Sequence, residues 1–178
     1  VGLERHAVGG VPYGGDHPQP VVGADRAERD LDQLDRTITD LRSTIFHLTT
    51  PIGSASTQLQ ECVAEAADRL GHEPTLQVIG DLDAVAPAVL DELVPTLSEA
   101  LSNVARHAQA TATEVTIDIG AESVVLTVTD DGVGIDPTAP RGNGLTNVEA
   151  RAELLGGVAS ITSSVTEGTT LTWTAPRP

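Results

Sequence analysis

The stretch EVTIDIGAESVVLTVTDDGVG, residues 114–134, decides the fold. It contains two β-branched runs joined by Gly-Ala-Glu, a pattern that predicts a β-hairpin with strands over 114–119 and 123–129. The second run leads into two acids and two glycines, Asp130-Asp131-Gly132-Val133-Gly134. The hairpin is therefore predicted to end in a carboxylate and a glycine-rich turn.

Helical and strand-like patterns flank this hairpin on both sides. The predicted elements are helices over 55–71, 86–108 and 145–155 and strands over 75–79, 158–163 and 169–175. Pro95 interrupts the second helix and is expected to begin a fresh one. A loop is expected over 137–143, where two prolines and a glycine occur without periodicity. This order predicts an α/β fold, a two-layer sandwich with helices on one face of the sheet.

The first fifty residues divide into two parts. Residues 1–23 are rich in glycine and proline and are expected to form a flexible lead-in. Over 24–50, apolar residues recur at spacings of three and four, which predicts a helix with a narrow apolar seam. The seam consists of Leu31, Leu34, Ile38, Leu41, Ile45 and Leu48. It needs a partner, either a second helix or the chain's own globular domain, which is expected over 54–178.

Composition excludes several classes of function. The 178-residue chain has a formal net charge of −16, which opposes binding to nucleic acid or to an anionic membrane. The single cysteine, Cys62, excludes an internal disulfide and a metal site built from several cysteines. The sequence shows no apolar stretch of about 18 residues and no signal-peptide pattern, so we expect a soluble, cytoplasmic fragment without membrane contact.

The segment Glu99-Ala100-Leu101-Ser102-Asn103 places an acid and an amide four residues apart in a helical pattern. That spacing puts both side chains on one helix face. The amide oxygen of Asn103 is a hard ligand suited to Mg²⁺, which takes few protein ligands beside nucleotide phosphates. Arg106 and His107 follow three and four residues later, so they are predicted to share this face and to contact phosphate. The alternative is a set of ordinary helix residues that bond locally or face solvent.

A second glycine-rich segment, Gly142-Asn143-Gly144-Leu145, opens the last predicted helix. Free N–H groups at a helix N-terminus can bind phosphate oxygens, so Gly142, Gly144 and Leu145 are candidate phosphate contacts. The segment is not a Walker loop, because no Gly-Lys-Ser/Thr follows it.

In this order, the three segments resemble the GHKL family of ATPases, which includes gyrase, a heat-shock chaperone, histidine kinases and a mismatch-repair protein. The chain is most similar to the histidine-kinase branch that partners DNA-binding response regulators. Residues 99–108 resemble its N-box, 130–135 and 142–157 its two glycine boxes, and 31–48 the second helix of its dimerisation unit. The resemblance covers about residues 24–175 and implies a Bergerat-type ATP-binding fold with a mixed sheet.

The resemblance also implies ligands for individual residues. Asn103 corresponds to the magnesium ligand, and Arg106 stands where the family usually has Lys. Asp130 corresponds to the residue that reads adenine, because a carboxylate accepts a hydrogen bond from the exocyclic amine and repels the carbonyl of guanine. Its side chain points into the site if Val128 faces the core. The cofactors implied are ATP and Mg²⁺.

Other matched positions have less definite roles. Glu99 corresponds to the acid that activates water in hydrolytic relatives and assists the attacking imidazole in kinases, or it is a surface carboxylate without a role. Gly132 and Gly134 let the backbone approach the base. Thr169 resembles the family's closing Gly-Thr element or is an ordinary strand residue. Asp131 stands where many relatives have Asn, and we assign it no role.

A histidine kinase needs a phosphoacceptor histidine on the helix before the seam. The histidines of the chain are His6, His17, His47, His72 and His107, and none lies in the His-Asp context of the family. We expect the phosphoacceptor helix to lie outside this fragment, which then binds ATP without phosphorylating itself. The expected partners are that helix, in a full-length homodimeric kinase, and the receiver domain of a response regulator.

Two other functions compete with the ATP-binding catalytic domain of a sensor histidine kinase. A stand-alone serine kinase of the anti-sigma type shares the pocket, but the predicted helix over 24–50 opposes it. The other is a module without activity: one that binds a partner and has lost nucleotide is opposed by the intact Asn103, Asp130 and glycines, whereas one that still binds ATP stays an alternative.

Overall fold

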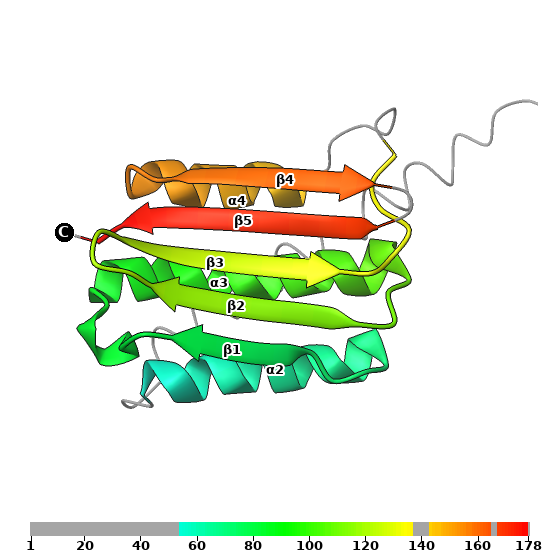
Figure 1. The fold of residues 1–178 in the computed structure, drawn as a ribbon, viewed down its shortest axis with the longest axis horizontal. Coiled ribbons are helices and arrows are strands. Elements are labelled where there is room, and N and C mark those ends of the chain that lie inside the picture. The colour runs from blue at the N-terminus through cyan, green and yellow to red at the C-terminus, as the bar shows by residue number, and fades with distance from the viewer. Residues whose placement is uncertain (1–53, 137–142, 165–166, 178) are drawn as a thin grey trace, which may run out of the picture. The chain divides into compact units, whose positions relative to one another are not determined.

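In the computed structural model, the predicted hairpin lies within a five-stranded sheet (Figure 1). The strands are β1 (Thr75–Ile79), β2 (Thr113–Ile119), β3 (Ser123–Asp130), β4 (Val158–Ser164) and β5 (Gly168–Pro176). Their order across the sheet is β1-β2-β3-β5-β4. β1 runs parallel to β2, and the other neighbouring strands are antiparallel, so the sheet is mixed as the resemblance implied.

The structure describes residues 54–136, 143–164 and 167–177. They all fall in the second of the chain's two units, residues 50–178. The predicted lead-in, the helix over 24–50, Gly142 and most of the predicted loop lie outside the described residues.

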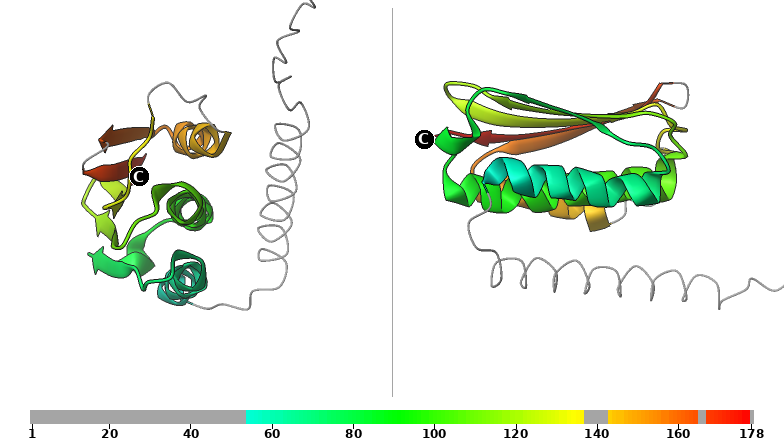
Figure 2. Two further views of the ribbon diagram at one scale, coloured as in Figure 1. Left: turned by 90° about the vertical axis from the view of Figure 1, so that its right-hand side faces the viewer. Right: turned by 90° about the horizontal axis from the view of Figure 1, so that it is seen from below.

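In the described residues, helices cover one face of the sheet (Figure 2). They are α2 (Ala55–Leu70), α3 (Pro87–Asn103) and α4 (Asn143–Leu154), with the short helices η1 (Leu82–Ala84) before α3 and η2 (Val104–Ala108) directly after it. Gly71 ends α2 in the left-handed conformation, with φ 75°, and its N–H donates to the Ala67 carbonyl. The predicted two-layer sandwich with helices on one face is therefore confirmed.

Pro95 does not begin a new helix. It lies inside α3, which continues unbroken from Pro87 to Asn103, so that part of the prediction is wrong. A proline in a helix interior removes one backbone hydrogen bond and crowds the preceding turn. The Thr96 hydroxyl donates to the Glu92 carbonyl at 2.6 Å, an added bond in that turn. The helix is also held by burial of its apolar face.

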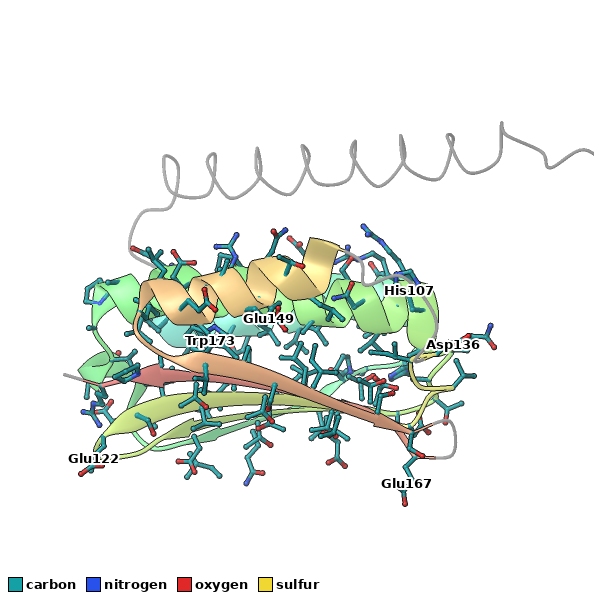
Figure 3. The ribbon with its side chains drawn as sticks, turned by 90° about the horizontal axis from the view of Figure 1, so that it is seen from above. His107, Glu122, Asp136, Glu149, Glu167 and Trp173 are labelled. Atoms are coloured by element: carbon teal, nitrogen blue, oxygen red, sulfur yellow. The ribbon has the colours of Figure 1, made fainter. Side chains whose placement is uncertain are left out.

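Alternation along the strands sends apolar side chains to the helix-covered face. The buried rows across β2, β3 and β5 are Val115, Val128 and Leu171, then Ile117, Leu126 and Trp173. Trp173 lies between the sheet and the helices (Figure 3). Helix residues that join the same core are Leu59, Leu93, Leu97, Leu101 and Val148. Each fully buried side chain of this kind contributes about 1.5–3 kcal/mol, so these rows hold the two layers together.

The opposite face of the sheet is mostly polar, although Ile79, Val125 and Val158 also lie on it. One row crosses all five strands and consists of Gln77, Thr116, Thr127, Thr172 and Ser160. A sheet face of hydroxyl and amide groups can meet water directly. This composition explains why the helices of the described residues gather on the other face.

Candidate functional site

A row of polar side chains lies at the end of the inner sheet face, one step beyond the apolar rows. Strand register places Thr113, Asp130, Thr169 and Ser163 opposite one another on β2, β3, β5 and β4, and we refer to these four residues as the polar row. Val128 is buried on the inner face, and Asp130, two residues later on the same face, is only 5% exposed. Val128 therefore faces the core, which was the condition for the Asp130 side chain to point into the predicted site.

Hydrogen bonds hold both sides of the polar row. On the β2 side, Thr113 is buried, and its hydroxyl lies 2.9 Å from Nε2 of His72. On the β4 side, the hydroxyls of Ser163 and Thr169 are 3.1 Å apart. The Ser163 hydroxyl also accepts from the N–H of Ile135 at 2.7 Å. Thr169 thus lies beside Asp130 as part of a bonded set.

The glycines that follow Asp130 permit close backbone contacts. Oδ1 of Asp130 accepts from the N–H of Gly132 at 2.9 Å, which leaves acceptor capacity on a carboxylate with about four lone-pair sites. A Cβ on Gly132 would lie 2.7 Å from the Cβ of Ala108, and one on Gly134, with φ 71°, would lie 2.8 Å from the carbonyl carbon of Ser164. Because Cβ atoms essentially never come within 3.0 Å, both positions require glycine.

Asp131, which received no role from the sequence, ties two segments together. Its Oδ1 accepts from the N–H of Thr111 at 2.7 Å and of Ala112 at 2.8 Å, and its Oδ2 accepts from the Thr111 hydroxyl at 2.6 Å. The Asp131 N–H in turn donates to the Ala112 carbonyl at 3.3 Å. These hydrogen bonds, the Thr111 hydroxyl first, lower the pKa of the Asp131 carboxyl to about 2. We refer to Asp131, Thr111 and Ala112 as the Asp131 clamp.

The end of α3 meets the start of α4. Asn103 is the last residue of α3, and Glu99 lies one turn earlier. A Cβ on Gly144 would collide with Oε1 of Glu99 and would come within 3.3 Å of the Asn103 amide. Nδ2 of Asn103 is buried and has no hydrogen-bond partner in the described part of the chain. The structure thus brings Glu99, Asn103 and Gly144 together.

Residues 104–108 form a π-helix, which the spacing argument did not anticipate. A π-helix bonds residues five apart, so a spacing of three no longer puts Arg106 on the face of Asn103. Arg106 and His107 are both exposed, whereas Asn103 is half-buried. The α-helical premise of that prediction is therefore wrong. Figure 3 shows His107 at the same end of the molecule as Asp136, which follows the glycine segment.

Two contacts align α4 antiparallel to α3. Near the end of α4, Nη1 of Arg151 donates to Oε2 of Glu92 at 2.7 Å. At its start, Gly144 lies against Glu99. The side chain of Leu145 packs against the hydrophobic core, so only its backbone is available to a ligand.

The donor set at the end of α3 fits Mg²⁺ as an ion that arrives with a nucleotide. Carboxylate and amide oxygens are hard ligands, and Mg²⁺ keeps several waters or takes phosphate oxygens for its remaining positions. No group of three or more His, Cys, Asp or Glu within the described ranges could hold a metal alone. The amide nitrogen of Asn103 has no partner among the described residues, and a rotation of the amide exchanges its nitrogen and oxygen.

Sequence comparison finds relatives among signalling proteins. The sequence model of the family described as histidine kinase-, DNA gyrase B- and HSP90-like ATPases matches residues 88–178. The chain is 31% identical over 134 residues to the sensor histidine kinase LiaS of Bacillus subtilis, covering 73% of this chain and 37% of LiaS. It is 34% identical over 143 residues to the sensor histidine kinase NarS of Mycobacterium tuberculosis, covering 76% of this chain and 33% of NarS.

Structural comparison supports the fold. The blue-light activated histidine kinase EL346 of Erythrobacter litoralis matches with a TM-score of 0.60 and 22% identity, over 84% of this chain and 50% of that one. The chain therefore spans about a third of its curated relatives and half of this solved structure. Every helix in the described ranges is too short or too polar to span a bilayer.

Proposed function

Since this chain belongs to the family of histidine kinase-, DNA gyrase B- and HSP90-like ATPases, we propose that the polar row and the end of α3 bind opposite ends of one ATP molecule. The burial of Asp130 carries this proposal. A carboxylate that is 5% exposed at the end of an apolar strand needs donors, and the chain supplies the N–H of Gly132. A ligand amine completes its bonding.

Asp130 selects adenine in this proposal. Its free acceptor sites receive the exocyclic amine of adenine, whereas the carbonyl of guanine at that position would face a negative charge without a proton between them. Gly132 and Gly134 keep the backbone beside the base free of side chains. Thr169 lies next to Asp130 in the polar row, and its hydroxyl offers a donor to the same edge of the base.

Asn103 and Glu99 serve the phosphate end. Asn103 holds Mg²⁺ through its amide oxygen, and the start of α4 at Gly144 and Leu145 offers backbone N–H groups to the phosphates. Bound Mg²⁺ would neutralise charge on the phosphate oxygens during transfer. Arg106 and His107, exposed on the π-turn, add positive charge or donors at this end. Glu99, one turn before Asn103, accepts the proton of the attacking group.

The reaction we propose is transfer of the γ-phosphoryl group to a histidine outside this fragment. The bond between the β,γ-bridging oxygen and the γ-phosphorus breaks, a bond from phosphorus to the imidazole nitrogen forms, and ADP leaves. The similarity to sensor histidine kinases favours this reaction over a serine kinase of the anti-sigma type. The full-length protein then acts in the cytoplasm as a homodimer, with residues 24–50 as part of the dimerisation unit, and passes the phosphoryl group to a receiver domain.

Calorimetry with ATP, ADP and GTP, each with and without Mg²⁺, tests the binding proposal on the 178-residue chain. We expect ATP and ADP to bind, Mg²⁺ to strengthen ATP binding, and GTP to give no heat. Equal affinity for GTP and ATP would contradict the role of Asp130. Unchanged ATP affinity without Mg²⁺ would contradict the role of Asn103.

A phosphotransfer assay tests the reaction. The chain is mixed with γ-labelled ATP and with a fragment of a related sensor kinase that carries a phosphoacceptor helix. Label is expected on the added fragment and not on this chain. Stable labelling of this chain alone would contradict the proposed division of labour.

A further inference from the structure

We infer that Asp131 is a positioning residue that fixes the base end of the site relative to the phosphate end, through the Asp131 clamp. This inference rests on the proposed function and adds to it a residue that does not itself contact the nucleotide. It starts from the observation that the two ends of the site belong to segments far apart in the sequence. Asn103, Arg106 and His107 precede the loop at 109–112, whereas Asp130 ends β3.

The connection between these segments is built from a few hydrogen bonds. Regular pairing of β2 with β3 reaches its last residue pair at Thr113 and Asp130. Beyond that pair, the Asp131 clamp continues the attachment with three donors on one carboxylate. The N–H of Val133 then donates to the carbonyl of Ala108, the last residue of η2, at 2.8 Å. The clamp therefore lies between the two parts of the site.

The loop held by the clamp has an unfavourable local conformation. Gln109, directly after the π-turn, has φ 52°, in the left-handed region that non-glycine residues seldom adopt. Such a residue persists only where the surrounding structure holds it. Hydrogen bonds hold the chain on both sides of Gln109, because Val133 bonds the carbonyl of Ala108 before it and Asp131 bonds Thr111 and Ala112 after it.

The chemistry of the clamp separates conservative from disruptive substitutions. An Asn at this position keeps one oxygen for the two backbone N–H groups and can donate its amide hydrogen to the Thr111 hydroxyl. An Ala keeps neither interaction. Asp131→Asn is therefore expected to preserve the position of the loop, and Asp131→Ala to release it.

The experiment compares adenosine with Mg²⁺-ATP on the full chain, by competition with a fluorescent ATP analogue. Adenosine contacts only the base end, so its affinity is insensitive to the spacing of the two ends, whereas ATP needs both. Asp131→Ala is expected to lower the affinity for ATP about tenfold and the affinity for adenosine less than about twofold. Asp131→Asn is expected to stay within about twofold of the unsubstituted chain for both ligands.

The control is Asp81→Ala. Oδ1 of Asp81 accepts from the N–H of Asp83 at 3.0 Å, so this substitution also removes a hydrogen bond from an Asp to a turn. Asp81 follows β1, which runs parallel to β2 and so ends at the sheet end opposite the polar row. Both affinities are expected to be unchanged. A loss of ATP affinity in Asp81→Ala would show that the effect of Asp131→Ala comes from general destabilisation.

Equal weakening of both ligands by Asp131→Ala, or no weakening of either, would overturn the inference. If Asp131→Ala does not fold, Thr111→Val removes only the hydroxyl hydrogen bond of the clamp. It is expected to lower the affinity for ATP about threefold and to leave the affinity for adenosine unchanged. Equal effects of Thr111→Val on the two ligands would then overturn it. An unsubstituted chain that binds neither ligand would instead refute the proposed function.

Discussion

Arg151 on α4 donates to Glu92 on α3 at 2.7 Å, and this ion pair joins the two helices at the end away from Asn103. At the other end of α4, Gly144 lies against Glu99, near Asn103. The Arg151 and Glu92 side chains are 28% and 18% exposed, so water screens the pair only in part. The ion pair therefore helps to hold the start of α4 over the proposed phosphate end.

Breaking this pair is expected to destabilise the domain. Arg151→Ala should lower the free energy of unfolding by about 1 kcal/mol, because it leaves the Glu92 carboxylate half-buried without its partner. Urea unfolding followed by circular dichroism measures this. The exchanged variant, Glu92→Arg with Arg151→Glu, is expected to regain part of the loss. A double-mutant cycle with no coupling energy would show that the pair contributes nothing.

Asp130→Asn is expected to remove binding of a fluorescent ATP analogue, with a loss of roughly a hundredfold or more. The amide can turn an N–H toward the adenine amine, so that two donors face each other. Asp118→Asn is the matched control, because Asp118 is an exposed carboxylate on β2. Unchanged affinity in Asp130→Asn would remove the adenine assignment.

Gly132→Ala is expected to destabilise the domain by about 1–3 kcal/mol, because the added methyl group would overlap Ala108. Gly120→Ala provides the comparison, since the nearest atom to its added carbon, the Ser123 carbonyl oxygen, lies at 3.4 Å. That variant should remain within about 0.5 kcal/mol of the unsubstituted chain. Thermal unfolding distinguishes the two variants, and equal melting temperatures would refute the close contact between Gly132 and Ala108.

Acid should release the Asp131 clamp. The pKa of Asp131 is lowered from 3.8 to about 2, so the folded state favours the carboxylate. Its contribution to stability is therefore complete above about pH 4 and is lost as the pH falls toward 2. Asp131→Asn should flatten the pH dependence of the unfolding free energy in this window. Denaturant unfolding at several pH values measures the slope, and identical slopes would contradict the hydrogen bonds assigned to Asp131.

Local patterns were sufficient to predict the strands and most of the helices. Strand 75–79 matches β1, and the hairpin 114–129 matches β2 and β3 to within one residue at the ends. Alternation of apolar residues has a short period, so a strand can be recognised from a few neighbouring residues. Pro95 was mispredicted because burial of α3 outweighs the local preference against proline.

The π-turn and the Asp131 clamp could not be predicted in the same way. η2 depends on how the end of α3 meets the loop before β2, and no spacing rule signals it. Asp131 and Thr111 are twenty residues apart and meet only because β2 and β3 pair. The roles of Glu99, Asn103 and Asp130 remain predictions that the experiments above test.

The polar row continues the same strands that build the apolar core, and this ties recognition to strand register. Side chains on a strand alternate between faces, so a slip of β3 by one residue would turn Asp130 to the outer surface and bring Thr129 inward. The same slip would expose Val128 and Leu126 to water. A misregistered chain would thus lose the purine contact proposed for Asp130 and its stability in one event, so quality control that removes unstable chains would also remove the misregistered ones.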